Sequence, residues 1–411
     1  MQISLHSPLR KVLFAGGCLV MVSFYLFFAI RSYRAYRLAE RGDFESAIKL
    51  EPGNADYHQQ FGQLQLFTDP RTQHSIESLT RSVALNPYSA RTWLALASSY
   101  QVQGDTEQQR KAILQAVNMD ATTPEIAWEA ALFFVARGEI DPALRYLRVM
   151  SEYDNPSLAL DAAWRLTHDP EKILRSSMPE TVAAHTQFLR LMVANNQPVG
   201  AEKTWAHLMR MRQSFDPKLV FFYFDYLIQR QDGTAARNAW RDLVGLIPAL
   251  SNYNNLTNSI VNADFEEELL NGGLDWQFKT TSGTSLALDT STFYSGARSL
   301  AITYKGESNF DSGVSQFIPV EPNSRYQLTG YTKGDQISSA NGPYLTVSDA
   351  RTSIQLAKTE EFTGSYPWKP ASLEFQIGPD TSVVVLAIHR NPSSTRIRGK
   401  LWLDNLSLIP K

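Results

Sequence analysis

The pattern of apolar and polar positions divides this 411-residue chain into three parts. Residues 12–30 are apolar or uncharged throughout. From about residue 35 to 250, apolar residues recur every three or four positions, which is the period of amphipathic helices. From about residue 262 onward, apolar and polar residues alternate, which is the period of half-buried strands. The pattern predicts one long apolar helix, then an all-α region, then an all-β region.

The apolar segment is long enough to cross a membrane. Its 19 residues span about 28 Å at ~1.5 Å per residue, close to the ~30 Å hydrocarbon core of a bilayer. We therefore expect a single transmembrane anchor at residues 12–30. A cleaved signal peptide is one alternative, but Arg31 follows the apolar run directly, where a small-residue cleavage site would be needed. Lipidation of Cys18 and a buried core helix are two others.

The all-α region repeats itself with a period of 34 to 35 residues. Gly104 and Gly138 lie 34 residues apart, and Trp205 and Trp240 lie 35 apart in similar segments, AEKTWAHL and ARNAWRDL. Further pairs at the same spacing are Pro52 with Pro87, Ala201 with Ala236, and Leu208 with Leu243. Several independent pairs with one period indicate stacked copies of one helical unit.

The segment from Trp93 to Tyr100, WLALASSY, fits the pattern W-x2-L-G-x2-Y with Ala97 in place of glycine. On these motifs, residues 35–250 resemble tetratricopeptide repeats. The resemblance implies an all-α solenoid of five to six helical hairpins that presents a surface to a protein partner. We expect Trp205 and Trp240 to be buried between hairpins. Small residues let the paired helices approach; they include Ala97, Ala116, Ala143, Ala201 and Ala236. Two stretches depart from the pattern, a short unit at 42–52 and an irregular connector at 167–180.

The all-β region contains alternating segments separated by Gly, Pro, Asn and Ser clusters. The clearest are 299–304, 326–332, 344–349, 372–377, 383–389 and 401–408. Eight or so short strands predict a β-sandwich. The order of motifs resembles the carbohydrate-binding modules of the CenC-like type: Asn262–Glu266 (NADFE), Ser295–Leu300 (SGARSL), Pro322–Gly330 and Gly399–Leu408. The resemblance implies a galactose-binding-like jelly roll over residues 262–411, joined to the helices by a short linker near 249–261.

The same resemblance implies a structural calcium ion. In such modules a glutamate after the opening phenylalanine and an aspartate in the closing strand commonly meet at this ion, which nominates Glu266 and Asp404. Calcium prefers carboxylate and carbonyl oxygens, so backbone groups around 296–299 would complete the shell. The alternative is a pair of solvated or hydrogen-bonded carboxylates without a metal.

Polysaccharide binding requires aromatic platforms and polar side chains on an open face. The candidates are Tyr331, Tyr344, His389 and Arg390. We expect Trp276, Trp368 and Trp402 to pack in the core or at strand edges instead.

Composition and motifs exclude several functions. The formal net charge of −2 gives no field that favours nucleic acid. A single cysteine allows no disulfide framework and no cysteine-based metal site. The chain has no GxSxG, HExxH or phosphate-binding-loop pattern, so we do not expect an enzyme.

The orientation in the membrane has two readings. Arginines gather after the apolar run, at positions 31, 34, 37 and 41, which by the positive-inside rule favours a cytoplasmic C-terminal side. The same arginines suit the polar face of a helix that continues beyond the bilayer. Long domains are translocated largely regardless of the charge that flanks the membrane segment. The carbohydrate-binding modules that this region resembles act mostly outside the cytoplasm. We therefore expect the C-terminal domains to be extracytoplasmic, in the periplasm or at the cell exterior.

These features together predict a membrane-anchored adaptor of the cell envelope. The helical array would bind a protein partner and the sandwich would bind glycan, in polysaccharide assembly or export. The alternative is a purely structural scaffold with a ligandless sandwich, and a polysaccharide-processing enzyme is disfavoured.

Overall fold

The computed structural model describes residues 8–411 apart from 70–72, 154–155, 254–257, 280–282, 309–310 and 391–394. The chain forms two compact units, Met1–Pro179 and Glu180–Lys411. The division falls inside the helical region, at the proline-containing stretch that departs from the repeat pattern.

The first unit begins with a single long helix, α1 (Pro8–Glu40). Its part from Lys11 to Glu40 is long and apolar enough to cross a membrane, as an anchor or as a signal sequence. The helix continues past the apolar run, as the arginine pattern allowed. In this continuation Ala35 is fully buried against Ala47 and Tyr57, so the C-terminal end of α1 packs on the following helices.

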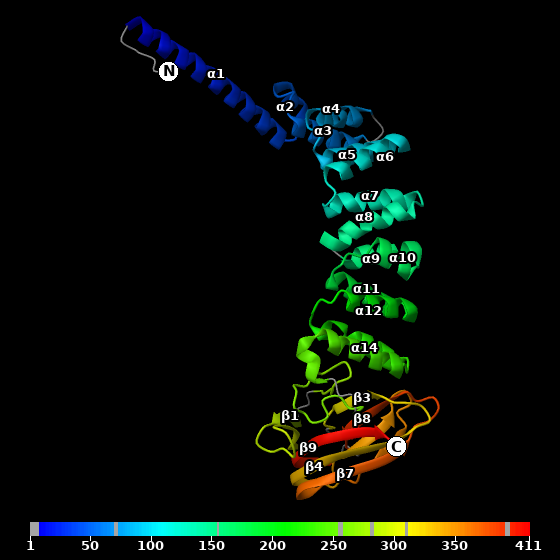
Figure 1. Ribbon diagram of the computed structural model, residues 1–411. Helices are drawn as coiled ribbons and strands as arrows, with labels where there is room; N and C mark the ends of the chain where they lie inside the picture. The colour runs from blue at the N-terminus through cyan, green and yellow to red at the C-terminus, as the bar shows by residue number, and fades with distance from the viewer. Residues whose placement is uncertain are drawn as a thin grey trace. The chain divides into compact units, whose positions relative to one another are not determined.

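In the described part of the first unit, the helices that follow α1 form a series of hairpins (Figure 1). They are α2 (Phe44–Leu50), α3 (Ala55–Thr68), α4 (His74–Leu85), α5 (Ala90–Gln103), α6 (Thr106–Met119), α7 (Pro124–Ala136), α8 (Ile140–Tyr153), α9 (Pro156–Thr167) and α10 (Pro170–Ser176). The small residues Ala97, Ala116 and Ala143 are buried where paired helices meet, as the sequence predicts. The unit at α2 is indeed short, with seven residues.

The expected irregular connector at 167–180 contains a helix. Residues 170–176 form α10, because Asp169 caps its first turn by accepting from Lys172 N at 3.1 Å and Pro170 occupies the first turn. Proline is favourable at that position because its missing N–H has no partner there in any case. The proline that suggested an interruption therefore starts a helix.

The helices of the second unit surround an aromatic core. They are α11 (Val182–Ala194), α12 (Pro198–Arg210), the 3₁₀ turn η1 (Pro217–Val220), α13 (Phe221–Gln229), α14 (Gly233–Leu246) and the 3₁₀ turn η2 (Pro248–Tyr253). Trp205 and Trp240 are 5% and 6% exposed, so their predicted burial is confirmed. Phe224 lies edge-on to both, with ring centroids 5.9 Å and 5.6 Å away.

The segment expected as a linker near 249–261 is partly structured. Leu250 and Tyr253 of η2 are buried, and the Tyr253 hydroxyl donates to the carbonyl of Glu268 at 2.5 Å. Two apolar side chains spaced by three residues were enough to dock this turn, although its composition is typical of a loop. Residues 254–257 lie outside the described part.

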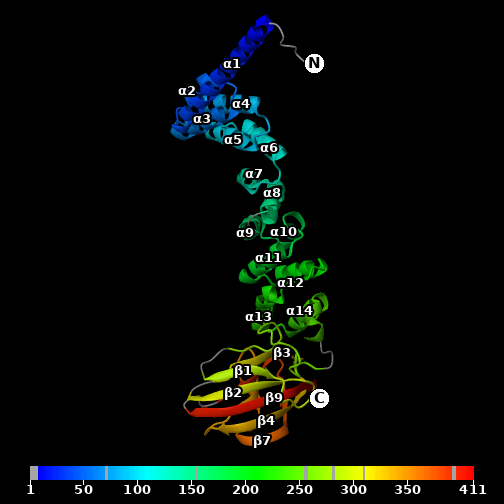
Figure 2. The same cartoon turned by 90° about the vertical axis from the view of Figure 1, so that its left-hand side faces the viewer.

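The β-sandwich consists of two antiparallel sheets (Figure 2). The five-stranded sheet has the order β1-β2-β9-β4-β7, and the four-stranded sheet has the order β3-β8-β5-β6. The strands are β1 (Thr284–Asp289), β2 (Ser299–Ser308), β3 (Val314–Pro319), β4 (Arg325–Ser338), β5 (Tyr344–Asp349), β6 (Gln355–Lys358), β7 (Gly364–Gln376), β8 (Val383–His389) and β9 (Arg396–Pro410). The core between the sheets includes the fully buried Trp276 and Phe265. This confirms the predicted all-β jelly roll.

The sandwich packs against the last helical hairpin within the second unit. Gly272 and Gly273 lie so close to Phe221 and Trp240 that an added Cβ would come within 2.3 Å and 2.6 Å of the two rings. Arg237 of α14 donates to Glu321 Oε1 at 2.7 Å and to the carbonyl of Pro319. The helices α13 and α14 therefore share a packed contact with the sandwich.

Candidate functional site

The outer face of the five-stranded sheet carries an aromatic cluster formed by Tyr294, Tyr331 and Trp368. Alternation along β4 directs Leu328 into the core and Tyr331 outward. The rings of Tyr294 and Tyr331 are stacked, with centroids 3.5 Å apart and planes 13° apart. Trp368 of β7 lies edge-on to Tyr294 at 6.0 Å. Because Tyr294 is 42% exposed, the cluster presents aromatic surface to solvent.

Two carboxylates hold the loop that carries Tyr294. Asp404 Oδ2 accepts from the backbone N–H of Tyr294 at 2.7 Å and of Ser295 at 3.0 Å. Glu266 Oε1 accepts from the backbone N–H of Ala297 at 2.7 Å and from that of Arg298 at 3.1 Å. Hydrogen bonds to a charged acceptor are about twice as strong as neutral ones. The two residues nominated for calcium therefore meet at one loop, and this loop positions the stacked tyrosine.

A glycine is required within this loop. Gly296 has φ +68°, and a Cβ there would lie 2.1 Å from Glu266 Oε1. The left-handed backbone is disfavoured for residues with a side chain, and the carboxylate fills the space that a side chain would need. This explains the glycine of the SGARSL motif.

Asp404 is a buried carboxylate with one oxygen that lacks a hydrogen-bond partner among the described residues. Its side chain is fully buried, and this oxygen is Oδ1. Burial raises the pKa of Asp404, the N–H groups of Ser295 and Tyr294 lower it, and the charge of Glu266 raises it further. A cation at Oδ1 would remove both the unsatisfied lone pairs and the like-charge repulsion.

The donor set therefore fits a hard cation in its chemistry. Both side chains supply oxygens, which calcium prefers. Within the described ranges no three His, Cys, Asp or Glu side chains gather as a metal-binding group. A calcium ion here would take Glu266, Asp404 and backbone carbonyls, as the resemblance implies.

Trp402 lies on the same sheet face but is covered. It is 6% exposed, and the ammonium groups of Lys400 and Lys333 lie 4.5 Å and 5.4 Å from its ring centroid. Its Nε1 donates to Asp289 Oδ2 at 2.8 Å. Although burial opposes the shift, hydrogen bonds from Lys400, Ser291 and Trp402 hold the pKa of Asp289 well below its usual range. As expected, Trp402 is a packed residue and not an open platform.

Three of the candidate ligand-binding residues meet on the other sheet. Tyr344 of β5 pairs with His389 of β8, and their rings are perpendicular with centroids 5.5 Å apart. His389 Nδ1 lies 2.5 Å from Asp311 Oδ2. Tyr344 is only 4% exposed, so little of its ring is open to a ligand.

Arg390 is also buried, with 4% of its surface exposed. Its guanidinium donates to the carbonyls of Asn341 and Thr395 and to the Ser339 hydroxyl, at 2.9, 2.6 and 2.7 Å. These bonds fasten two chain segments together. The structure thus brings Tyr344, His389 and Arg390 together, and places Tyr331 on the opposite sheet.

The sequence did not single out Tyr294. It placed Trp368 in the core or at a strand edge, and β7 is an edge strand of its sheet, but it did not count Trp368 among the ligand-binding candidates. Tyr294 lies in a loop without periodicity, so no pattern shows that it reaches Tyr331. Trp368 follows Pro367 on β7, where the pairing register with β4 shifts. This irregularity hides which face of the sheet the side chain occupies.

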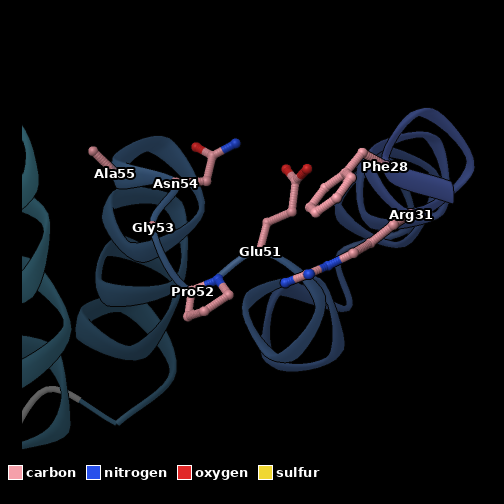
Figure 3. Close-up of a pocket in the computed structure, with 7 residues that line it drawn as sticks. All are labelled: Phe28, Arg31, Glu51, Pro52, Gly53, Asn54 and Ala55. Atoms are coloured by element: carbon pink, nitrogen blue, oxygen red, sulfur yellow. The ribbon is translucent and has the colours of Figure 1, made fainter. Parts of the chain in front are cut away.

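A pocket of about 640 Å³ lies in the first unit, where α1 meets the start of α3 (Figure 3). Phe28 and Arg31 line it on one side and residues 51–55 on the other. Arg31 Nε donates to the carbonyl of Leu50 at 2.5 Å, and Ser32 donates to Glu51. These contacts tie the end of the apolar run to the first hairpin.

Comparisons with known proteins bear on the strand region. Residues 257–395 match the family described as carbohydrate binding domain. Solved structures similar to the chain include the xylan-binding domain of Xyn10C from Paenibacillus barcinonensis (15% identity, 36% of this chain and 91% of that chain, TM-score 0.26). Another is a CBM4 module, with 13% identity over 37% of this chain and 100% of that chain and a TM-score of 0.29. A third is MamA, with 17% identity over 43% of this chain and 93% of that chain and a TM-score of 0.25. None of the curated proteins matches the chain.

The family match supports a carbohydrate-binding domain in the C-terminal part of the chain. It covers the strand region, so the tetratricopeptide resemblance of the helical region stays a prediction. The same holds for the membrane anchor, which rests on the length and composition of α1.

Proposed function

We propose that this chain is a membrane-anchored glycan-binding adaptor of the cell envelope, which acts by binding and not by catalysis. The sandwich binds polysaccharide through the aromatic cluster of Tyr294, Tyr331 and Trp368. The helical array binds a protein partner of a polysaccharide assembly or export system. The observation that carries the proposal is an exposed aromatic stack on a domain that matches a carbohydrate-binding family.

The chemistry of sugar recognition supports the choice of the aromatic cluster. A pyranose ring has an apolar face of C–H groups, which packs on an aromatic ring and removes apolar surface from water. Tyr294 is held in place before any ligand arrives, because its loop is bonded to Asp404 and Glu266. A platform that is already ordered loses less conformational entropy on binding.

The proposal includes a calcium ion at Glu266 and Asp404. Its part would be structural, since the two carboxylates hold the loop of Tyr294. The unpartnered Oδ1 of the buried Asp404 supports it.

The orientation follows from the function, with the sandwich outside the cytoplasm. Two of the arginines that oppose it by charge count are engaged within the protein: Arg31 with the carbonyl of Leu50 and Arg37 with Glu40 at 2.7 Å. Such contacts suit a helix that continues into the folded array.

A glycan array probed with the intact chain in uncharged detergent tests the proposal. We expect binding to a restricted set of polysaccharides. If no glycan binds, the sandwich is a ligandless structural module and the chain is a scaffold.

A further inference from the structure

A second concave site lies in the helical part of the second unit, separate from the sandwich. It is a groove of about 420 Å³ between α12, α13 and α14. Its floor contains the rings of Trp205, Tyr223 and Tyr226, all largely buried. Val199, which is 61% exposed, forms an apolar part of the rim. We call this the α12–α14 groove.

Acidic side chains dominate the charge of the α12–α14 groove. Glu202, Asp232 and Asp242 line it and are exposed. Asp232 caps α14 by accepting from Ala235 N at 3.0 Å, and Asp242 Oδ2 accepts from Trp205 Nε1 at 3.2 Å. Each therefore has a fixed position and retains lone pairs for a further donor.

One cation lines the groove in the described part of the chain, and it is already engaged. Arg230 donates to Asn196 Oδ1 at 3.1 Å and lies 5.5 Å from the ring centroid of Tyr226. Three carboxylates therefore face one arginine. The pKa of Tyr223 is raised first by burial and then by the charges of Glu202, Asp232 and Asp242, which is consistent with a negative potential over the aromatic floor.

Exposed carboxylates around a concave site suit a positively charged ligand. An ammonium or guanidinium group gains from them by charge-assisted hydrogen bonds, while the rings below are too buried to offer it much surface. An acidic peptide or a nucleic acid would be repelled. The groove is lined by residues of three helices, and its carboxylates reach solvent.

We propose that the α12–α14 groove binds an extended lysine- or arginine-bearing peptide segment of a partner protein. This deepens the adaptor part of the proposed function, on which it rests, by giving the chemistry of the partner. The cationic side chain sits between Glu202 and Asp242 over the aromatic floor, and small neighbouring residues of the peptide contact Val199.

Fluorescence anisotropy with the intact chain in uncharged detergent tests this assignment. The probes are fluorescein-labelled nine-residue peptides of Gly and Ser that carry three lysines, three glutamines or three glutamates. We expect the lysine peptide to bind and the other two not to bind. Glu202→Gln and Asp242→Asn should each weaken binding about fivefold, since an exposed charge pair contributes up to about 1 kcal/mol. Asp380→Asn, an exposed carboxylate on the sandwich, should leave binding unchanged.

Charge reversal provides a test that loss of folding cannot imitate. The Glu202→Lys, Asp242→Lys variant should lose the lysine peptide and gain the glutamate peptide. Two results would overturn the proposal. One is equal binding of the lysine and glutamate peptides by the wild type, and the other is unchanged binding of the lysine peptide by the Glu202→Gln, Asp242→Asn double variant. Displacement of the lysine peptide by spermidine at an equal concentration would assign the groove to a free polyamine instead.

The glycan proposal is read separately on the same preparation. Tyr331→Ala should bind the lysine peptide like the wild type. If the peptide fails to bind while glycan binding persists, the assignment of the groove fails and the glycan site stands.

Discussion

Replacing Gly273 with alanine tests whether the sandwich is packed on the last helical hairpin. The added Cβ would lie 2.6 Å from Trp240 Cζ3 and 3.2 Å from Phe221 Cε1. Both contacts are with rigid rings that are themselves buried, so neither can rotate away cheaply. Gly273 also has φ +64°, where any residue with a Cβ is strained. Gly364, with φ +76° and open space around it, provides a matched control.

The two variants separate the backbone strain from the clash. A left-handed residue with a side chain costs about 1–2 kcal/mol, and both variants incur this cost. Inserting a methyl group into a packed core costs roughly 1–3 kcal/mol more, which applies to Gly273→Ala alone. We therefore expect Gly273→Ala to lower the free energy of unfolding by about 2–5 kcal/mol and Gly364→Ala by about 1–2 kcal/mol.

Native-state hydrogen exchange on the intact chain measures the effect locally, which avoids assuming that a chain with two units unfolds in one step. Peptides that cover α14 and β3 report on the two sides of the contact. We expect Gly273→Ala to accelerate exchange in both. Equal exchange in the Gly273→Ala and Gly364→Ala proteins would refute the packed contact.

Three further predictions follow from buried and paired groups. Trp240→Ala should lower the stability of the α13–α14 hairpin by about 3–5 kcal/mol through lost burial and a cavity; a loss below about 1 kcal/mol, measured by hydrogen exchange in α14, would contradict the assigned packing. Burial raises the pKa of Asp275 to about 7, so the folded state binds more protons than the unfolded state between about pH 4 and 7, and stability falls as pH rises through that range. Asp275→Asn should remove up to about 4 kcal/mol of this fall, and unchanged pH dependence would show that the carboxyl is not protonated. Calcium should raise the melting temperature of the intact chain by binding the folded state, and Asp404→Ala should abolish the rise, whereas a wild-type chain insensitive to calcium would exclude the ion.

The regular elements were predictable because their periods depend on burial alone. The segments 299–304, 344–349 and 383–389 lie within β2, β5 and β8, since each has one face in the core. The burial of Trp205 and Trp240 followed from their shared position in a repeat. Periodicity and repeat position are properties of the sequence itself, so both predictions could be made without a structure.

The aromatic cluster could not be predicted in the same way. Tyr294 reaches Tyr331 because Asp404 accepts a hydrogen bond from the backbone of Tyr294. Asp404 lies on β9, which is far from Tyr294 in sequence but pairs with the strand of Tyr331. Such a contact depends on strand order, which periodicity does not specify. The same limit applies to Arg390, whose charge suggested an exposed ligand contact but whose guanidinium is buried and donates to the carbonyls of Asn341 and Thr395.

The central claim is that the sandwich binds glycan on the aromatic cluster. Affinity gel electrophoresis of the intact chain tests it most directly. The gel contains a polysaccharide that the glycan array has identified as a ligand. The account predicts that the wild type and Tyr88→Ala, a control tyrosine 81% exposed on the helical region, are retarded equally. It predicts that Tyr331→Ala and Trp368→Ala lose most of this retardation. Retardation of these two variants equal to that of the wild type would contradict the assignment.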